Sequence, residues 1–355
     1  TSLLFLALDG AGPRWGFRLG FIWGVLSYGI TLSWMWTIFQ GISAGLWSIL
    51  AFFPAVFGSW FGTVTRDGSP SPAKTPSWRA RNRGPWWAPP TAALVWTGLE
   101  YFRCEWFILR FPWITPGTIM SPTGLAPVIG TYGITFLVVL AITTLTLRAR
   151  HAFPIGIALV IVIVVSLVPT RPRAVPGDDI HTVALVQSEQ GYFAAYRELT
   201  ENIEEPVDAI IWPEYALSYD IRQDPHDMAV SRDLLQRTGA QFLTLGSRTD
   251  IDDVGNYYNT AITIGPDTIL GTHYKNRPVH FFDDGEPGER LNAISTPIGK
   301  IATPVCFDCV STAVARRLVL DGAEVFLVPS MDAEHWTARQ HEQHAQLFRH
   351  RAAEN

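Results

Sequence analysis

The first half of this 355-residue sequence almost lacks acidic side chains. Residues 1–174 contain 4 Asp and Glu against 13 Lys and Arg, whereas residues 175–355 contain 28 against 14. Twelve of the 14 Trp residues also lie in the first half. Such a division excludes one uniform globular protein, because its two halves belong to different compositional classes. We therefore expect a membrane part followed by an acidic, soluble part.

Other absences narrow the class of protein further. The positive charge forms short clusters between apolar runs and no continuous basic face, which excludes a strongly basic nucleic-acid binder. The sequence has no internal repeat, no Gly-rich phosphate loop and no visible cleavable signal peptide. It begins at Thr1 instead of Met and stops at Asn355, directly after an expected helix, so we expect both ends to be cut.

Four apolar runs are long enough, or nearly so, to cross a bilayer, which takes about 20 helical residues. They are Gly16–Phe39, Gly41–Val64, Leu125–Leu147 and Ala152–Val168. A fifth, weaker run near Ala88–Phe102 contains Glu100, and Arg103 follows it. An ionisable side chain at membrane depth is costly and usually faces protein or marks function. The alternative is a helix end at the interface, with the Arg103 side chain reaching toward water.

Basic loops predict the orientation of these runs, since Lys and Arg in short loops stay cytoplasmic. Nine basic residues fall on one side if the weak fifth run also crosses: Arg14, Arg18, Arg66, Lys74, Arg79, Arg81, Arg83, Arg148 and Arg150. Four lie on the other side: Arg103, Arg110, Arg171 and Arg173. We therefore predict a multi-span α-helical membrane domain over residues 1–170, with about five spans and a basic cytoplasmic loop at 65–90. The chain after Val168 would then lie outside the cytoplasm.

After Pro172 the pattern changes to short β-rich runs separated by helical stretches. The expected strands are His181–Gln187, Ala209–Trp212, Gln241–Leu245, Ala261–Ile264, Ile301–Val305 and Glu324–Val328. The expected helices lie near Tyr196–Ile203, Met228–Thr238, Thr312–Asp321 and Arg339–Ala353. Strands that alternate with helices predict an α/β layered domain with its active residues at strand ends.

Three expected strand ends carry reactive side chains. Glu214 follows the apolar run at 210–212, Lys275 ends the run that starts at Thr272, and Cys306 follows Ile301–Val305. Acyl transfer through a thiol needs a nucleophile, a base that removes its proton and a positive group for the oxyanion. These three residue types fit those roles, although each alone is as well explained by a solvated loop residue or a buried thiol.

Two further arrangements remain open on the residues alone. Cys306 and Cys309 form a Cys-x-x-Cys spacing that would suit a disulfide or redox pair outside the cytoplasm, but the flanks do not resemble a thioredoxin-like helix start. Four histidines near the end of the chain could form a zinc site: His335, His341, His344 and His350. Because no Cys partners stand at ligand spacing, a polar helix face is the better explanation.

At the three strand ends the sequence resembles the nitrilase, or carbon-nitrogen hydrolase, superfamily. The motifs in chain order are Trp212-Pro213-Glu214, Tyr274-Lys275-Asn276, Cys306-Phe307-Asp308, Gly322-Ala323-Glu324, Val328-Pro329-Ser330 and Arg351-Ala352-Ala353-Glu354-Asn355. Each is short, but their joint order and spacing make chance matching unlikely. The resemblance implies a nitrilase-like αββα sandwich over residues 178–355, with its C-terminal part missing.

The membrane half narrows the resemblance to the apolipoprotein N-acyltransferase family. Four segments are similar to the membrane part of that family: Leu3–Trp36, Trp96–Arg103, Phe111-Pro112-Trp113 and Gly130–Gly133. The resemblance covers nearly the whole chain. It also supplies a reason for the presence of Glu100 inside a helix.

The resemblance implies a role for each residue of the triad. Cys306 is the nucleophile, Glu214 the general base and Lys275 the group that stabilises the oxyanion, with Phe307 and Asp308 in supporting positions. A second essential Glu follows the Lys in this family, within a Pro-Phe-Gly-Glu motif.

The matching stretch here, residues 278–286, departs from that motif. We assign the second acid to Glu286, which matches if three residues are inserted, and Asp283 is the alternative. A further departure is the segment at 329–334, which is closer to other nitrilases than to this family.

The implied reaction moves a fatty acyl chain from a phospholipid, through a cysteine thioester, to the α-amine of an S-diacylglyceryl-cysteine lipoprotein. It needs no metal or diffusible cofactor and no nucleic-acid partner. The implied location is the bacterial inner membrane, with the catalytic domain on the periplasmic side. Two alternatives remain open: a membrane-tethered nitrilase-like amidase or hydrolase, and a catalytically silent paralogue that binds lipid or lipoproteins.

Overall fold

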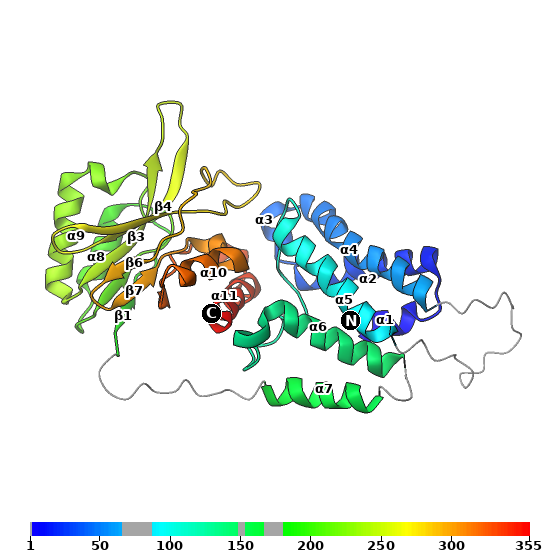
Figure 1. Cartoon of the computed structure of the whole chain (residues 1–355). Coiled ribbons are helices and arrows are strands. Elements are labelled where there is room, and N and C mark those ends of the chain that lie inside the picture. The colour runs from blue at the N-terminus through cyan, green and yellow to red at the C-terminus, as the bar shows by residue number, and fades with distance from the viewer. Residues whose placement is uncertain (1, 66–86, 148–152, 167–179) are drawn as a thin grey trace, which may run out of the picture. The chain divides into compact units, whose positions relative to one another are not determined.

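The computed structural model describes residues 2–65, 87–147, 153–166 and 180–355, which belong to two compact units (Figure 1). The first unit comprises residues 1–170 and 335–354, and the second comprises residues 171–334 and Asn355. Most of the predicted basic loop at 65–90 lies outside the described residues. Arg148, Arg150, Arg171 and Arg173, which entered the predicted orientation, also lie outside them.

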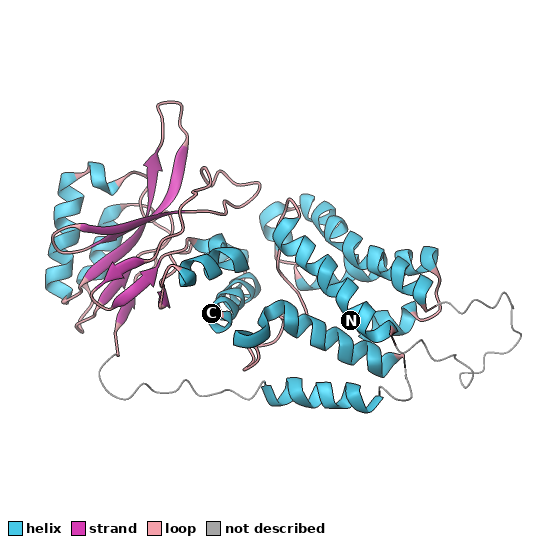
Figure 2. Cartoon of the chain, in the orientation of Figure 1, coloured by secondary structure: helices cyan, strands magenta, loops and turns pink. Residues whose placement is uncertain are grey.

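The described part of the first unit is built from helices (Figure 2). They are α1 (Ser2–Leu8), α2 (Pro13–Thr31), α3 (Met35–Phe39), α4 (Ile42–Val64), α5 (Ala88–Tyr101), α6 (Ala126–Thr146), α7 (Phe153–Ser166) and α11 (Ala338–Glu354). A π-helical turn at Phe102–Trp106 continues α5. Among the described residues, α4 and α6 are long and apolar enough to cross a membrane.

Length and composition thus support two of the five predicted spans. The first predicted run, Gly16–Phe39, is interrupted, because α2 ends at Thr31 and α3 begins only at Met35. The α5 helix and the described part of α7 have 14 residues each, fewer than the roughly 20 that a bilayer core requires. Apolar composition alone does not reveal where a turn divides a run. For this reason the sequence does not predict the interruption of Gly16–Phe39.

The α2 and α4 helices pack with their backbones in close approach. Gly16, Gly20 and Gly24 recur every four residues along α2, and all three are buried. A Cβ atom at Gly20 would lie 2.2 Å from the backbone oxygen of Pro54, and one at Gly16 would lie 2.1 Å from that of Gly58. Small residues at this spacing let two apolar helices touch along their length, as membrane helices commonly do.

The second unit contains two β-sheets. The first has the strand order β1 (Val183–Leu185), β2 (Ala209–Ile211), β3 (Phe242–Asp250), β4 (Tyr257–Ile264) and β5 (Ile269–Tyr274). Its first three strands run parallel, and β4 and β5 are antiparallel to their neighbours. The second sheet has the order β6 (Ile294–Thr296), β7 (Gly299–Ala302) and β8 (Val325–Phe326).

The two sheets lie between helices. Ile210 of β2 packs into a core with α8 (Phe193–Glu201) and α9 (Pro225–Thr238), whereas its neighbour Ile211 packs with Ile301 of the second sheet. Successive residues of a strand face opposite sides, so β2 is apolar on both faces. On the far side, Ala302 packs with Leu318 of α10 (Thr312–Leu320). The order helix, sheet, sheet, helix confirms the predicted αββα class for this unit.

Residues 335–354 belong to the first unit, whereas the sequence groups them with the second domain. Most of the buried side chains of α11 are polar: Gln340, His344, His350 and Arg351, with Leu347 as the apolar member. The Glu354 carboxylate accepts a hydrogen bond of 2.7 Å from the backbone N–H of Thr131 in α6. The packing of α11 on α6 is therefore largely polar, and an apolar pattern does not reveal it.

Matched alanine substitutions on α2 test the backbone contact with α4. Gly20→Ala should lower the melting temperature of the detergent-purified protein, because the new methyl group meets the Pro54 carbonyl and overpacking of this kind costs about 1–3 kcal/mol. Gly29→Ala adds the same group to the same helix, where the nearest atom, on Trp47, is 3.7 Å away. Equal melting temperatures for the two variants would contradict the close packing.

Candidate active site

Glu214 follows β2 in a turn that the neighbouring strand supports. The residue is only 3% exposed, and the next residue, Tyr215, has a positive φ of 53°. Gly246 of β3 donates its backbone N–H to the Pro213 carbonyl at 3.1 Å, and a Cβ there would lie 2.3 Å from that oxygen. Glycine is therefore required at position 246 for the Glu214 turn to lie against β3.

Lys275 follows the last residue of β5 and is buried, with 1% exposure. Its Nζ atom lies 2.7 Å from Glu214 Oε1 and 2.7 Å from Asp284 Oδ2. Burial by itself would lower the pKa of Lys275, but the negative charges of Glu214 and Asp284 outweigh burial and raise that pKa above its ordinary value. Lys275 therefore remains a fixed positive charge in this site.

Cys306 begins a short 3₁₀ helix, Cys306–Val310, after β7. Its φ of 46° is in the left-handed region, which is rare for a residue with a side chain and occurs often at functional sites. Burial, followed by the negative charge of Glu214, raises the pKa of the Cys306 thiol well above its usual value, although Lys275 opposes this. The resting side chain is therefore a protonated thiol that needs a base.

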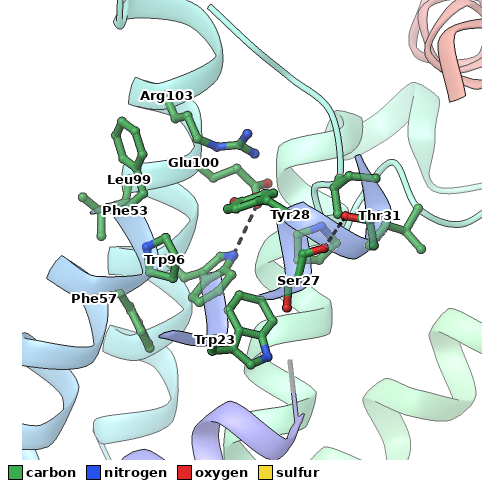
Figure 3. A pocket seen from close by; sticks show the side chains of 14 residues that line it. Trp23, Ser27, Tyr28, Thr31, Phe53, Phe57, Trp96, Leu99, Glu100 and Arg103 are labelled. Carbon is green, nitrogen blue, oxygen red and sulfur yellow. Dashed lines mark hydrogen bonds between the residues drawn. The ribbon is translucent and has the colours of Figure 1, made fainter. Parts of the chain in front are cut away.

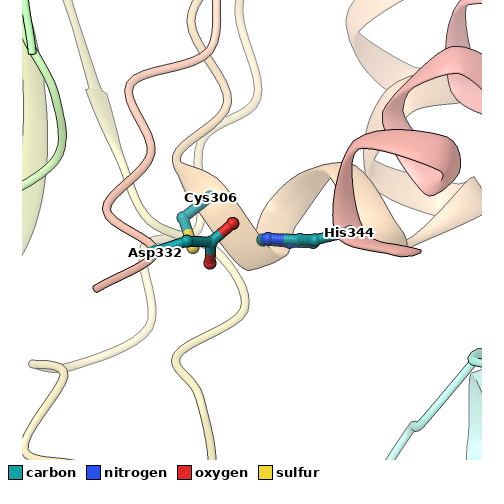
Figure 4. A group of neighbouring side chains, drawn as sticks. All are labelled: Cys306, Asp332 and His344. Carbon is teal, nitrogen blue, oxygen red and sulfur yellow. The ribbon is translucent and has the colours of Figure 1, made fainter. Parts of the chain in front are cut away.

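Asp332 adds a second negative group beside the thiol. One of its carboxylate oxygens lies within 4.8 Å of Cys306 Sγ, and Figure 4 shows the two side chains next to each other. Its charge also raises the pKa of Cys306. A single Asp in a loop carries no distinctive sequence pattern, so its position near the thiol does not follow from the sequence.

The three residues predicted to form the triad thus lie together within the second unit. Glu214 and Lys275 are in direct contact, and the charge of each acts on the Cys306 thiol. Cys309, the other cysteine of the Cys-x-x-Cys spacing, is also a free buried thiol. Cys306 interacts electrostatically with Lys275.

Asp308 connects the segment that carries the thiol to the segment that carries the ammonium group. Its carboxylate accepts hydrogen bonds from the backbone N–H groups of Val305 (3.1 Å), Asn276 (2.9 Å) and Arg277 (2.7 Å). The ring of His273 lies 2.8 Å from the same carboxylate. Asp308 is fully buried, so these groups fix the Cys306 turn relative to the Lys275 loop.

Phe307, the other supporting residue, is only partly buried. It packs against a small cluster formed by Ala261, Val305 and Cys306. Phe307 therefore contributes an apolar contact beside Cys306.

Besides Glu214, the acid that contacts Lys275 is Asp284, which is neither the predicted second acid Glu286 nor its alternative Asp283. Glu286 and Asp283 are both exposed. Asp284 is 6% exposed, and its second oxygen accepts hydrogen bonds of 2.8 Å from the Tyr215 hydroxyl and from the side-chain amide of Asn259. The backbone N–H of Val279 also donates to Asp284 at 2.6 Å, so the folding of this loop selects one of three nearby acids.

Glu100 and Arg103, at the end of α5 and in the turn after it, line a cavity of about 210 Å³ within the first unit (Figure 3). Glu100 accepts hydrogen bonds from Thr135 (2.7 Å) and from the Trp96 indole (3.3 Å). Arg103 is 2% exposed and donates to the backbone oxygen of Phe111 at 2.8 Å. Both side chains face protein, which excludes the interfacial alternative for Arg103 in this structure.

The histidines considered as zinc ligands have separate surroundings in the first unit. The His344 ring stacks on Trp113, with ring centroids 5.7 Å apart, and His350 lies 2.9 Å from the Met120 carbonyl. No three of the four predicted histidines lie close enough to share an ion among the residues that the structure describes.

Comparisons with known families match two successive regions of the chain. The model described as Apolipoprotein N-acyltransferase N-terminal domain matches residues 1–144, and the model described as Carbon-nitrogen hydrolase matches residues 182–355. Together they account for most of the sequence, in the same order as the two regions expected from it.

Similar proteins from several bacteria are named apolipoprotein N-acyltransferase. An apolipoprotein N-acyltransferase of Geobacter metallireducens is 25% identical over 414 residues, which cover 99% of this chain and 76% of that protein. One of Thermosynechococcus vestitus is 24% identical and covers 90% of this chain and 70% of its own length. Among solved structures, a carbon-nitrogen hydrolase of Helicobacter pylori has 21% identity and a TM-score of 0.40, over 47% of this chain and 68% of that one.

Two alanine variants distinguish the buried acid from the exposed one. Asp284→Ala should lower the stability of the protein by about 3 kcal/mol, because the Lys275 ammonium loses one of its buried partners. Glu286→Ala removes an exposed side chain from the same loop and should change stability by less than about 0.5 kcal/mol. Denaturant unfolding of the two variants measures the difference, and a larger loss for Glu286→Ala would reverse the assignment.

Proposed function

Because the chain belongs to the apolipoprotein N-acyltransferase family, we propose that it transfers a fatty acyl chain from a phospholipid to the N-terminal amine of a diacylglyceryl lipoprotein. The observation that carries the proposal is the buried contact of Lys275 with Glu214 beside Cys306. A nucleophile, a base and a fixed positive charge are the groups that acyl transfer through a thioester requires.

In the first step the Cys306 sulfur attacks the ester carbonyl of the phospholipid. Glu214 removes the thiol proton, and the Lys275 ammonium stabilises the negative oxygen of the tetrahedral intermediate. The ester C–O bond then breaks, Glu214 returns the proton to the departing oxygen, and a lysophospholipid leaves. The acyl group stays on Cys306 as a thioester.

Glu214 suits proton transfer because its two oxygens have different surroundings. Oε1 accepts hydrogen bonds from Lys275 and Asn259, both at 2.7 Å. Oε2 accepts one long bond of 3.3 Å from the backbone N–H of Met331 among the described residues. Oε2 therefore has lone-pair capacity left for the thiol proton.

In the second step the free α-amine of an S-diacylglyceryl-cysteine lipoprotein attacks the thioester carbonyl. Glu214 accepts a proton from the amine, the C–S bond breaks, and the Cys306 sulfur takes a proton back. The products are an amide and the free enzyme. Neither step requires a metal ion or a cofactor.

The first unit supports a membrane location for this reaction. Large apolar side chains are highly exposed on its helices, among them Leu26, Ile30, Ile42, Leu94 and Val128. Exposed apolar surface over several helices is typical of contact with lipid. We propose a multi-span protein of the bacterial inner membrane, with the second unit on the periplasmic side, so that phospholipid and lipoprotein both reach the site from the bilayer.

Cysteine variants test the nucleophile directly. The full-length protein is incubated in detergent with a phospholipid labelled in its acyl chain, together with a diacylated lipopeptide. Cys306→Ala should abolish both the labelled enzyme and the labelled peptide amide. Cys309→Ala, which removes the neighbouring buried thiol, should retain both. If Cys306→Ala still forms acyl-enzyme, the proposed nucleophile is wrong.

The protonated state of the Cys306 thiol gives a pH prediction. Since its pKa is raised, little thiolate exists at neutral pH, and Glu214→Gln should slow acyl-enzyme formation about 10²–10⁴-fold there. The loss should shrink as the pH rises and the thiol ionises without a base. Glu286→Gln serves as the exposed control. A constant loss at every pH, measured by rapid quench, would argue against Glu214 as the base.

A further inference from the structure

The buried site holds one positive and two negative side chains in direct contact. The side chains of Lys275, Glu214 and Asp284 are 1%, 4% and 5% exposed, respectively. Two neighbouring carboxylates repel each other, and in a buried site one of them would tend to take up a proton. The two carboxylates share one ammonium group, so hydrogen-bond donors also matter for their charged forms: Tyr215 and Val279 donate to Asp284, and Met331 donates to Glu214.

Asn259 of β4 contacts all three charged residues. Its side-chain amide donates one hydrogen bond to Glu214 Oε1 at 2.7 Å and another to Asp284 Oδ1 at 2.8 Å. Its backbone oxygen accepts the N–H of Lys275 at 2.8 Å. The residue is fully buried, and the two amide hydrogens that Asn possesses are both used on carboxylates.

The charges also fix which way the Asn259 amide points. Its Oδ1 atom is buried without a hydrogen-bond partner among the described residues. A flipped amide would direct that oxygen at Glu214 and Asp284, where three oxygens would face one another without a proton between them. The observed orientation leaves one carbonyl unpaired and satisfies both carboxylates.

We propose that Asn259 is a positioning residue that keeps Glu214 and Asp284 ionised together against Lys275. Hydrogen bonds to a carboxylate favour its charged form, and Asn259 supplies one to each. Glu214 therefore remains able to take the Cys306 proton although a second anion lies beside it. The inference rests on the proposed function in one respect, the role of Glu214 as a base.

The test is the pH profile of Cys306 reactivity in the full-length protein. Iodoacetamide alkylates a thiol without needing a lipid substrate, and peptide mass spectrometry separates Cys306 from Cys309 and Cys104. In the wild-type protein the rate should fall at acidic pH, where Glu214 becomes protonated. Asn259→Leu should move this acid limb to higher pH by about one unit, which gives a roughly tenfold lower rate at acidic pH values on the limb.

Two further variants separate positioning from a general loss of stability. Thr263→Val changes another buried residue of β4, whose hydroxyl pairs with Thr244 at 3.0 Å, and should leave the acid limb in place. Asn259→Ser retains one donor and should give an intermediate shift, which also covers the case in which Asn259→Leu does not fold. An unshifted acid limb in the Asn259 variants, or an equal shift in Thr263→Val, would overturn the proposal.

Acyl-enzyme formation from labelled phospholipid is measured on the same samples. A shifted alkylation profile without acyl-enzyme in the wild-type protein would leave the positioning role intact and refute the acyltransferase. Acyl-enzyme in the wild-type protein together with an unshifted Asn259→Leu profile would support the acyltransferase and refute the positioning role of Asn259.

Discussion

The ion pairs of the buried Lys275 ammonium hold together segments that are distant in the chain. Glu214 comes from the end of β2, Lys275 from the end of β5 and Asp284 from the loop that follows. Removing one member of such a group leaves a buried charge without a partner, which is far more costly than losing an exposed pair. The positions of these three segments are therefore coupled, and the Cys306 turn joins them through the hydrogen bonds of Asp308.

Burial determines the protonation of the Cys306 thiol and, together with the neighbouring carboxylates, the charge of Lys275. A thiol in a dry site beside a carboxylate stays protonated, and a lysine between two carboxylates stays charged. The site thus places a carboxylate at the proposed base, Glu214, and a positive charge at Lys275, the group proposed to stabilise the oxyanion. The sandwich supplies the dry setting, because β2 is covered by helices on one face and by the second sheet on the other.

The class of the second unit follows from the alternation of strands with helices, which is a local pattern, whereas the three strand-end residues follow from the resemblance of their motifs to a known family. Asp284 follows from neither. Three acids stand within four positions of one another, and the choice among them depends on the fold of the loop around Val279. Asn259 leaves a faint signal, a polar amide within the apolar strand Tyr257–Ile264, but its two partners lie far away in the chain.

In the first unit, too, the sequence predicts local elements but not the contacts between distant segments. Apolar runs locate its helices, but the break between Thr31 and Met35 and the docking of α11 through polar side chains depend on contacts between distant segments. The periodicity of apolar residues describes one segment at a time. It therefore predicts neither the break after α2 nor the packing of α11.

The fate of the thioester on Cys306 distinguishes acyl transfer to a lipoprotein amine from hydrolysis. Acyl-enzyme formed with labelled phospholipid is freed of excess lipid and then mixed with a diacylated lipopeptide, and the label is followed over a single turnover. The label should leave Cys306 and appear as an amide on the peptide amine, faster than it is released as free fatty acid. Release of free fatty acid at the same rate with and without peptide would contradict it and indicate a hydrolase.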